Sequence, residues 1–437
     1  MRFFSTRGAH ETDFIGAVSQ GLAADGCLYV PEELPRFDPR DIEGNSLEEI
    51  GAQLLAPFAA GSPLAPELGA LCAQALDFPV PLVPVDKGRG PLWVLEVFHG
   101  PTAAFKDVGA RFLATVMEQA LPSLAPEEGR PLTILVATSG DTGGAVAAAF
   151  HRRRGMRVGV LFPKGQVSPR QKHQLTCWSD NVRSFEVNGT FDDCQSLVKS
   201  AFTDRTLNER HWLSAANSIN LGRLLPQVVY HAAASLRHWR AEYRPANFIV
   251  PTGNLGNALA CIWARAMGMP IGDIILATNA NRVLPEFLAT GDWQPRPSIQ
   301  TLASAMDVGN PSNMERLRHL LPDFAELRSS VEAYPVSDAA IRQQIAVDHE
   351  RLGRVWCPHT ATGFNVYDQL PQSRCSDASW IVVATAHPAK FDNIVEPATG
   401  ASVPVPPALA ALLELPSRWE SIDPDLEKFS VCLDEWI

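Results

Sequence analysis

From about residue 130 onward, short apolar runs alternate with helical stretches, and this alternation constrains the fold more than any other feature of the chain. The apolar runs have the composition of buried strands. The first series comprises Thr133–Ala137, Arg157–Phe162 and Val182–Val187, and the second comprises Asn247–Val250, Asp273–Ala277 and Trp380–Ala384. Strands that alternate with helices predict parallel sheets covered on both faces. We therefore expect an α/β fold with two parallel-sheet domains that face each other.

The first part of the chain has a different character. Residues 1–95 are rich in proline and glycine, and their helical patches are Leu47–Ala60 and Pro66–Leu76. They contain no strong phosphate-binding or metal-binding motif. We expect three units: an N-terminal domain over 1–95, a smaller α/β domain over 96–240 and a larger α/β domain over 241–437.

Composition argues against several classes of protein. Hydrophobic residues make up 46% and charged residues 19% of the chain, which is typical of a soluble globular protein. The net charge is −11 and the basic run at 151–154 is short, so a nucleic-acid partner is not expected. Eight cysteines without a C-x-x-C pair favour neither a metal site nor disulfides. Because no apolar signal core and no run of about 18 apolar residues occurs, we expect a cytoplasmic protein without a membrane segment.

Four unusual loops stand where strands are expected to end, and a fifth segment begins a long amphipathic helix. In open α/β sheets, ligands bind outside the carboxyl ends of the strands. The five segments are His99–Asp107, Thr138–Gly144, Gly253–Asn257, Thr385–Lys390 and the helix start Asn217–Asn220. We expect them to surround one binding site.

The loop Gly253–Asn257 has the composition of a phosphate-binding turn. Gly253 and Gly256 permit a close approach between backbone and ligand, and the helix that begins near Gly256 directs free N–H groups into the loop. A helix N-terminus favours an anion such as phosphate. A strand-to-helix turn that needs glycine for a positive φ is the alternative reading.

The loop Ser139–Gly144 has a similar ambiguity. Its small and polar residues suit a carboxylate or a phosphate. It lacks the Gly-Lys-Ser/Thr ending of a Walker loop and the G-x-G-x-x-G spacing of a dinucleotide-binding turn. ATP and NAD are therefore disfavoured as ligands.

Lys106 follows the apolar run Ala103–Phe105. Apolar surroundings lower the pKa of a lysine, and a neutral amine is the form that makes a Schiff base. A lysine beside a phenylalanine is also a common surface residue, so the local pattern alone leaves both readings open.

Segments spread along nearly the whole chain resemble the threonine synthase family, a group of fold-type II pyridoxal-phosphate (PLP) enzymes. They follow the order of the family's motifs. The segments are Ser5–Gly8, Asp25–Pro31, His99–Arg111, Thr138–Gly144, Asn217–Arg223, Gly253–Asn257, Ala305–Val308, Pro311–Asn313, Pro358–Ala361 and His387–Phe391. Pro226 departs from the helix-favouring residues common after Asn217–Asn220, and a proline costs about 3 kcal/mol in a helix interior unless the helix is kinked.

The resemblance implies a fold, a cofactor and a reaction. The fold would be of the tryptophan-synthase-β-like kind with an N-terminal extension, and PLP would be bound to Lys106 as a Schiff base. The enzyme would be a carbon–oxygen lyase of threonine biosynthesis. It would convert O-phospho-L-homoserine and water to L-threonine and phosphate by β,γ-elimination and replacement, acting as a monomer or homodimer.

The resemblance also implies roles for individual residues. The PLP phosphate would be bound by Gly253, Asn254, Leu255, Gly256 and Asn257. Thr385 would either contact the pyridine nitrogen or be a buried threonine that caps the next turn. Substrate contacts would come from Ser139, Gly140, Asp141, Thr142, Asn217, Ser218, Asn220 and Arg223. Because a carboxylate repels a carboxylate, Asp141 is expected to hold its loop. Lys164 and Arg223 either hold the leaving phosphate or are structural ion-pair partners. His99 and His387 either shuttle protons or only pack.

Three other functions stay open. A related phospholyase would give an oxo acid, ammonia and phosphate from the same substrate. Dehydration of serine or threonine is less favoured, because the N-terminal signature and Ala305–Val308 resemble threonine synthases. A non-catalytic metabolite-binding regulator would be expected to lack Lys106 or the loop Gly253–Asn257, and both are present.

Overall fold

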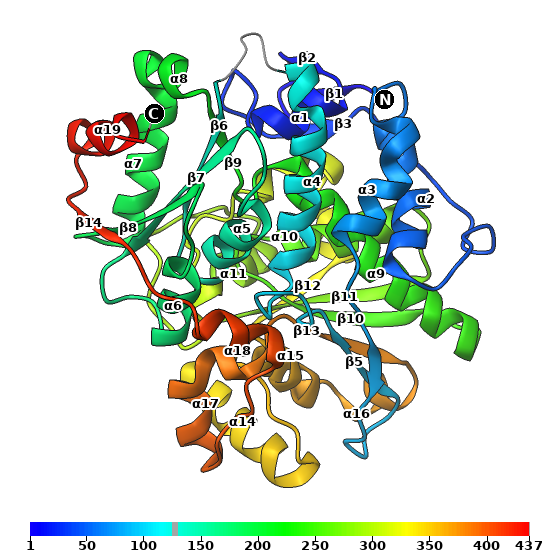
Figure 1. The fold of residues 1–437 in the computed structure, drawn as a ribbon. Helices are drawn as coiled ribbons and strands as arrows, with labels where there is room; N and C mark the ends of the chain where they lie inside the picture. Colours follow the sequence, from blue (N-terminus) through cyan, green and yellow to red (C-terminus); the bar gives the residue numbers. More distant parts are fainter. Residues whose placement is uncertain (125–129, 437) are drawn as a thin grey trace.

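The computed structural model describes residues 1–124 and 130–436 (Figure 1). Two large sheets with helices on both faces form two lobes, and a small antiparallel sheet lies near the N-terminus. The α/β fold class and the two facing parallel-sheet units are therefore confirmed.

The smaller lobe contains a five-stranded sheet in the order β14-β8-β7-β6-β9, and all of its neighbouring strands are parallel. The strands are β6 (Leu132–Ala137), β7 (Met156–Pro163), β8 (Val182–Val187), β9 (Leu213–Ala215) and β14 (Glu420–Ile422). Its helices are α5 (Asp141–Phe150), α6 (Pro169–Thr176), α7 (Phe191–Thr203), α8 (Arg205–His211), α18 (Pro407–Leu413) and α19 (Leu426–Asp434). Ser168 and Thr190 form capping boxes at the starts of α6 and α7.

The larger lobe contains a six-stranded sheet in the order β12-β11-β10-β13-β5-β4, in which only β4 and β5 pair antiparallel. The strands are β4 (Leu82–Pro84), β5 (Leu92–Glu96), β10 (Ala246–Pro251), β11 (Ile271–Thr278), β12 (Glu332–Pro335) and β13 (Trp380–Ala384). The helices of this region are α9 (Leu221–Glu242), α10 (Gly256–Ala266), α11 (Val283–Thr290), α12 (Met314–Leu320), α13 (Phe324–Ser330), α14 (Asp338–Leu352), α15 (Pro358–Gln369), α16 (Gln372–Ser376) and α17 (Asp392–Thr399). Short 3₁₀ turns are η2 (Ser304–Met306) and η3 (Pro388–Phe391).

Sheet membership cuts across the boundaries expected from the sequence. Strand β4 and all but the last residue of β5 lie within the expected unit 1–95 and yet belong to the larger sheet, where β5 pairs with β13. Strand β14 follows residue 241 and yet pairs with β8 of the smaller sheet. Chain segments therefore cross between the lobes near both ends of the sequence.

The N-terminal unit contains a small sheet and several helices that pack over the rest. Its elements are β1 (Phe3–Ser5), β2 (Glu11–Thr12), β3 (Tyr29–Pro31), α1 (Phe14–Gln20), α2 (Leu47–Ala59), η1 (Ala65–Glu67) and α3 (Leu68–Ala75). Helix α2 packs against α9. Both helical patches predicted in this region are confirmed, but the three short strands were not predicted.

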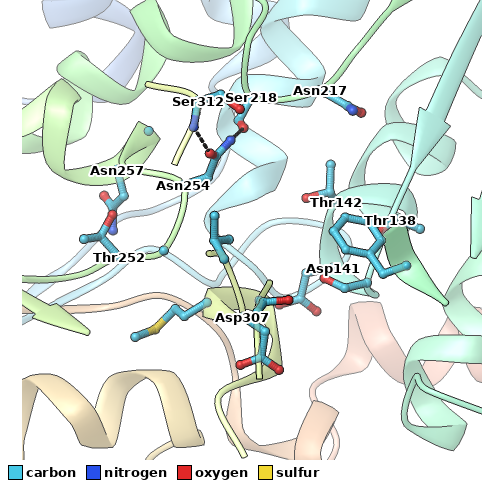
Figure 2. Close-up of a pocket in the computed structure, with 18 of the residues that line it drawn as sticks. Thr138, Asp141, Thr142, Asn217, Ser218, Thr252, Asn254, Asn257, Asp307 and Ser312 are labelled. Carbon is cyan, nitrogen blue, oxygen red and sulfur yellow. Dashed lines mark hydrogen bonds between the residues drawn. The ribbon is translucent and has the colours of Figure 1, made fainter. Parts of the chain in front are cut away.

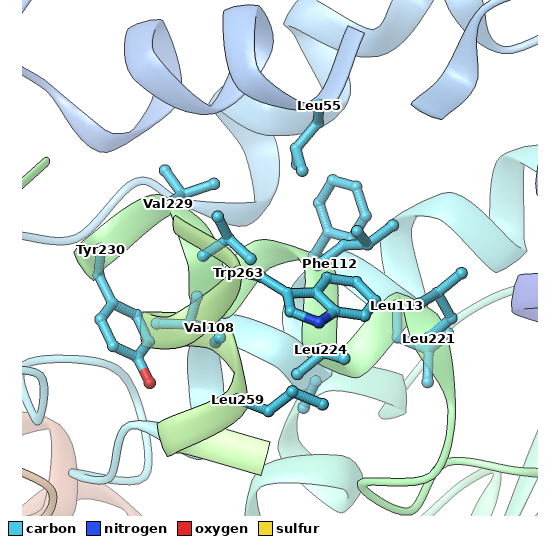
Figure 3. Close-up of a cluster of buried hydrophobic side chains, with 14 of the residues drawn as sticks. Leu55, Val108, Phe112, Leu113, Leu221, Leu224, Val229, Tyr230, Leu259 and Trp263 are labelled. Carbon is cyan, nitrogen blue, oxygen red and sulfur yellow. The ribbon is translucent and has the colours of Figure 1, made fainter. Parts of the chain in front are cut away.

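One hydrophobic core connects this unit to the helices that begin at the binding site. Figure 3 shows the Trp263 indole among Leu55, Phe112 and Leu224. These residues come from α10, α2, α4 (Lys106–Leu124) and α9 respectively. Burial of each large side chain stabilises the fold by about 1.5–3 kcal/mol. The shared core therefore fixes the first turns of α4, α9 and α10 relative to one another.

Helix α9 continues through Pro226 from Leu221 to Glu242, so the proline does not end it. Pro226 is buried, and it lies near the helix start, where few intrahelical bonds precede it. Within the described residues, no helix is both long and apolar enough to cross a membrane. The same residues contain no group of three or more His, Cys, Asp or Glu side chains placed to hold a metal ion.

Candidate active site

A cavity of about 360 Å³ opens between the two lobes (Figure 2). Its walls come from the carboxyl ends of β6, β10 and β13 and from the first turns of α4, α5, α9 and α10. Figure 2 shows Asn254 and Asn257 on one side of the cavity, and Thr138, Asp141 and Thr142 on the other. The five segments selected from the sequence therefore meet near one site.

Lys106 is the first residue of α4, and it lines the cavity. The loop before it is fixed, because the Phe105 N–H donates to the Thr385 carbonyl at 2.8 Å and Ala104 pairs with Ala386. The pKa of Lys106 is lowered to about 8, mainly because the amine is buried. The nearby Asp141 carboxylate raises this pKa, whereas the cations Arg223 and Lys390 lower it further. The neutral amine is therefore far more accessible than in an ordinary lysine.

The loop that follows β10 presents backbone N–H groups at the start of α10. Among the described residues, the N–H groups of 253–257 have no hydrogen-bond acceptor in the chain. Leu255 has a φ of +63°, in the left-handed region, and a Cβ at Gly253 would lie 2.6 Å from the Met306 Cα. Gly253, Asn254, Gly256 and Asn257 line the cavity, whereas the Leu255 side chain is buried in the core. This arrangement has the character of an anion site.

The asparagine side chains of this loop make bonds within the protein. Asn254 donates to the Ser218 hydroxyl at 2.6 Å and accepts from the Ser312 N–H at 2.5 Å, as Figure 2 shows. Asn257 accepts from the Tyr230 hydroxyl at 2.6 Å and donates to the Pro251 carbonyl at 3.2 Å. The amide side chains therefore hold the loop, and its backbone remains available to a ligand.

Thr385 lies directly after β13 and lines the cavity. Its hydroxyl is buried and has no hydrogen-bond partner among the described residues. An unpaired buried polar group is costly, so this hydroxyl suits a polar ligand atom.

The loop that follows β6 is held by Thr138, whose hydroxyl accepts from the N–H groups of Gly140 and Gly143 at 3.0 and 2.9 Å. Ser139, Asp141 and Thr142 line the cavity. Gly140 is not among the lining residues; its φ of +137° makes the turn into α5.

Asp141 forms a buried ion pair with Lys390 of η3, at 2.9 Å between Oδ1 and Nζ. Burial by itself would raise the pKa of Asp141, but Lys390 and Lys106 lower it well below its usual range. The expectation that Asp141 holds its loop therefore agrees with its contacts. Lys390 lies in the family-like segment His387–Phe391, but no role was predicted for its side chain. The order of the sequence does not show that η3 lies beside α5.

The start of α9 contributes Asn217, Ser218 and Arg223 to the cavity wall. Arg223 is buried, and burial lowers its pKa to about 10. Its Nη1 donates to the Ala216 carbonyl at 2.5 Å, and its Nε has no partner among the described residues. Asn220 is instead a fully buried helix cap that accepts from the Gly222 N–H and donates to the Val18 carbonyl, and it does not line the cavity.

Three further sequence candidates lie outside the cavity. Lys164 is exposed and donates to Asn188 at 3.2 Å, so it is not placed to contact a ligand in the cavity. His99 contacts Glu96 at 2.8 Å, and His387 caps η3 through the Ala389 N–H. For both histidines the alternative reading, packing and hydrogen bonding, matches the structure.

Several lining residues were missed by sequence reasoning. They are Phe191, Asp192, Gln195, Gln227, Thr252, Arg296, Pro297, Ser298, Met306, Asp307 and His359. Asp307 and His359 belong to family-like segments, which was the available signal. Burial raises the pKa of Asp307 to about 7, and burial lowers the pKa of His359 to about 4, so this imidazole is neutral at pH 7.

The cavity residues fit PLP. The cofactor has an aldehyde, a phosphate and a ring nitrogen, and the cavity offers an amine of lowered pKa, free N–H groups at a helix start and an unpaired hydroxyl. These three features are supplied by Lys106, residues 253–257 and Thr385.

Comparison with protein families gives three matches along the chain. Residues 75–386 match the family described as pyridoxal-phosphate dependent enzyme. Residues 2–76 match the threonine synthase N terminus, and residues 360–431 match the threonine synthase C-terminal family.

Individual relatives match over nearly the full length. Threonine synthases of Serratia marcescens and Escherichia coli are each 36% identical, over 95% of this chain and 95% of the relative. The crystal structure of threonine synthase from Escherichia coli has a TM-score of 0.90 at 32% identity and covers 100% of both chains. A PLP-bound threonine synthase structure from Brucella melitensis has a TM-score of 0.90 at 35% identity, over 100% of this chain and 99% of that one.

Proposed function

This chain belongs to the threonine synthase family of PLP-dependent enzymes, and on that premise we propose that it converts O-phospho-L-homoserine and water to L-threonine and phosphate. The observation that carries the proposal is the position of Lys106, a lysine of lowered pKa, in one cavity with the free N–H groups of 253–257. The lyase and regulator alternatives are not favoured, because the full-length relatives described above are threonine synthases.

Lys106 is proposed to hold the cofactor and to move a proton. When bound, PLP supplies an electron sink for negative charge that develops on the substrate. The Nζ of Lys106 would hold the cofactor, and as a neutral amine it would take the proton from the substrate Cα. A pKa of about 8 suits this task, because the neutral amine is then available near physiological pH.

The other cofactor contacts are proposed from unpaired groups. The N–H groups of Gly253, Asn254, Leu255, Gly256 and Asn257 would bind the PLP phosphate, aided by the dipole of α10. The Thr385 hydroxyl would contact the ring nitrogen. A neutral hydroxyl stabilises a protonated ring nitrogen less than a carboxylate would.

The substrate contacts are proposed by charge. Arg223 would bind the leaving phosphate, because its buried guanidinium lines the cavity with an unpaired Nε. Ser139, Thr142, Asn217 and Ser218 would donate to the substrate carboxylate, since they are neutral polar side chains that line the cavity. Asp141 does not obstruct this anion, because Lys390 pairs with its charge.

The substrate is a small molecule, and residues from both lobes of the chain line the cavity. We propose that the enzyme is a monomer or a homodimer.

Product analysis tests the proposed function. PLP-loaded protein is incubated with O-phosphohomoserine, and threonine, phosphate, oxo acids and ammonia are measured, with Lys106→Ala as the control. We expect equal amounts of threonine and phosphate from the wild type and neither from the variant. Oxo acid and ammonia instead of threonine would show a phospholyase. Bound PLP without turnover would show that O-phosphohomoserine is not the substrate.

A further inference from the structure

Lys390 is a completely buried lysine that contacts residues of both lobes, among them Asp141 of the cavity wall. Its Nζ lies 2.9 Å from Asp141 Oδ1 at the start of α5, and it donates to the Thr102 carbonyl at 2.8 Å. Its own carbonyl accepts from the Ser168 hydroxyl at 3.2 Å. Lys390 therefore contacts the five-stranded lobe and the loop before Lys106 at the same time.

Both partners of Lys390 are held by further bonds. Gln171 donates to Asp141 Oδ1 at 3.1 Å, and Gln174 donates to the Thr102 carbonyl at 3.1 Å. The Thr102 hydroxyl donates to the Asp107 carboxylate at 2.6 Å. Because Asp107 follows Lys106 directly in α4, the network reaches the backbone of the cofactor lysine.

The network also determines the charges that face Lys106. Asp141 is the anion that favours its protonated form, whereas Arg223 and Lys390 oppose that form. His359 is near as well, but burial keeps it neutral at pH 7. The carboxyl of Asp107 accepts hydrogen bonds from the N–H and the hydroxyl of Thr102. Asp141 thus has two cationic neighbours, and Lys390 is the one that makes the direct ion pair.

We propose that Lys390 is a positioning residue for the reaction, which fixes the Asp141 carboxylate beside Lys106 and occupies it as a permanent counter-ion. This inference rests on the proposed role of Lys106. Without Lys390, Asp141 would have Lys106 as its main partner and would hold that nitrogen in its protonated form. With Lys390, the nitrogen is free to lose its proton while the carboxylate stays in place.

A purely structural ion pair is the competing explanation. Buried ion pairs contribute little net stability compared with apolar side chains of similar volume. A contribution to stability therefore does not by itself explain why Lys390 and Asp141 are charged residues. Here the pair contains an anion whose next cationic neighbour is Lys106. A test must therefore measure a property of Lys106 that a structural pair elsewhere does not change.

The pH titration of the visible absorbance of bound PLP reports protonation of the nitrogen that Lys106 contributes. We expect Lys390→Met to raise the midpoint by about one pH unit or more, because a like charge is removed and Asp141 is left without its partner. The matched control is Lys87→Met, which removes a lysine whose side chain is 9% exposed and pairs with Asp348 at 2.6 Å outside the cavity. This control is expected to keep the wild-type midpoint.

A second pair of variants covers a failure of Lys390→Met to fold. Asp141→Asn is compared with the double variant Asp141→Asn/Lys390→Met. The double variant is expected to have the higher midpoint because a like charge is removed, but by less than Lys390→Met alone, because the carboxylate that Lys390 occupies is absent. Midpoints that do not change on loss of Lys390, in either background, would overturn the inference and leave a structural pair. A titrating absorbance band that survives in Lys106→Ala would instead reject the role of Lys106.

Discussion

The guanidinium of Arg223 is buried at the cavity wall with its Nε unpaired among the described residues. Burial disfavours its charge, as the pKa lowered to about 10 shows. An anionic ligand would satisfy the free donor and compensate the desolvation of the charge. At the scale of a single residue, Arg223 is therefore the side chain that a phosphorylated substrate is expected to stabilise most.

Replacement of Arg223 by glutamine is expected to lower kcat/KM for O-phosphohomoserine by at least about 30-fold, since truncation of a buried charged partner costs about 2–5 kcal/mol. The variant should still bind PLP, which absorbance checks. The control is Lys164→Gln, which removes an exposed cation outside the cavity and should leave kcat/KM unchanged. A larger effect from Lys164 than from Arg223 would reverse the assignment.

At the scale of elements, the turn between β10 and α10 depends on its close contact with η2. A Cβ at Gly253 would lie 2.6 Å from the Cα and 2.9 Å from the carbonyl oxygen of Met306, and this backbone cannot rotate away. A Cβ at Gly256 would meet nothing in the protein closer than 3.7 Å. The protein itself therefore excludes a side chain at Gly253, whereas at Gly256 it leaves room for one.

Gly253→Ala is expected to destabilise the protein without PLP by about 1–3 kcal/mol, because it overpacks the contact with Met306. Gly256→Ala should leave that stability nearly unchanged but weaken PLP binding, because its methyl group would meet the cofactor phosphate. Thermal unfolding with and without PLP measures both effects. Equal behaviour of the two variants would contradict a phosphate site at Gly256.

The elements were predictable from the sequence where the local pattern is strong. The buried strands β6, β8 and β13 lie within one or two residues of the predicted positions. Strands β4, β5 and β14 were not predicted, because short strands become strands only through pairing with distant partners. The same limit hid Lys390, since its contact with Asp141 depends on the packing of two lobes.

At the scale of the whole molecule, the last residues of the chain complete the smaller lobe. Strand β14 extends the five-stranded sheet, and α19 packs Phe429 against Phe185 with 5.4 Å between ring centroids. Phe429 is fully buried in the core of this face. We therefore expect the lobe that contributes Ser139, Asp141 and Thr142 to depend on the C-terminal segment for part of its stability.

Phe429→Ala is expected to lower the free energy of unfolding by about 3–5 kcal/mol, because it leaves a cavity in this core. Val431→Ala, on the exposed side of the same helix, is the control and should change it little. Denaturant unfolding measures both. A loss for Phe429→Ala no larger than that for Val431→Ala would show that α19 is dispensable for the lobe.

The pairing of β5 with β13 has a consequence for the order of events during synthesis on the ribosome. Strand β5 ends ten residues before Lys106, but its neighbour toward the middle of the sheet is β13, which is translated nearly last. Until residue 384 has emerged, β5 lacks this neighbour, and Thr385 and the loop after β10 cannot surround the lysine. Contacts between such distant segments form slowly. For most of translation the nascent chain therefore contains an incomplete sheet with an unpaired edge of β5. We expect PLP to bind only when the polypeptide is almost finished.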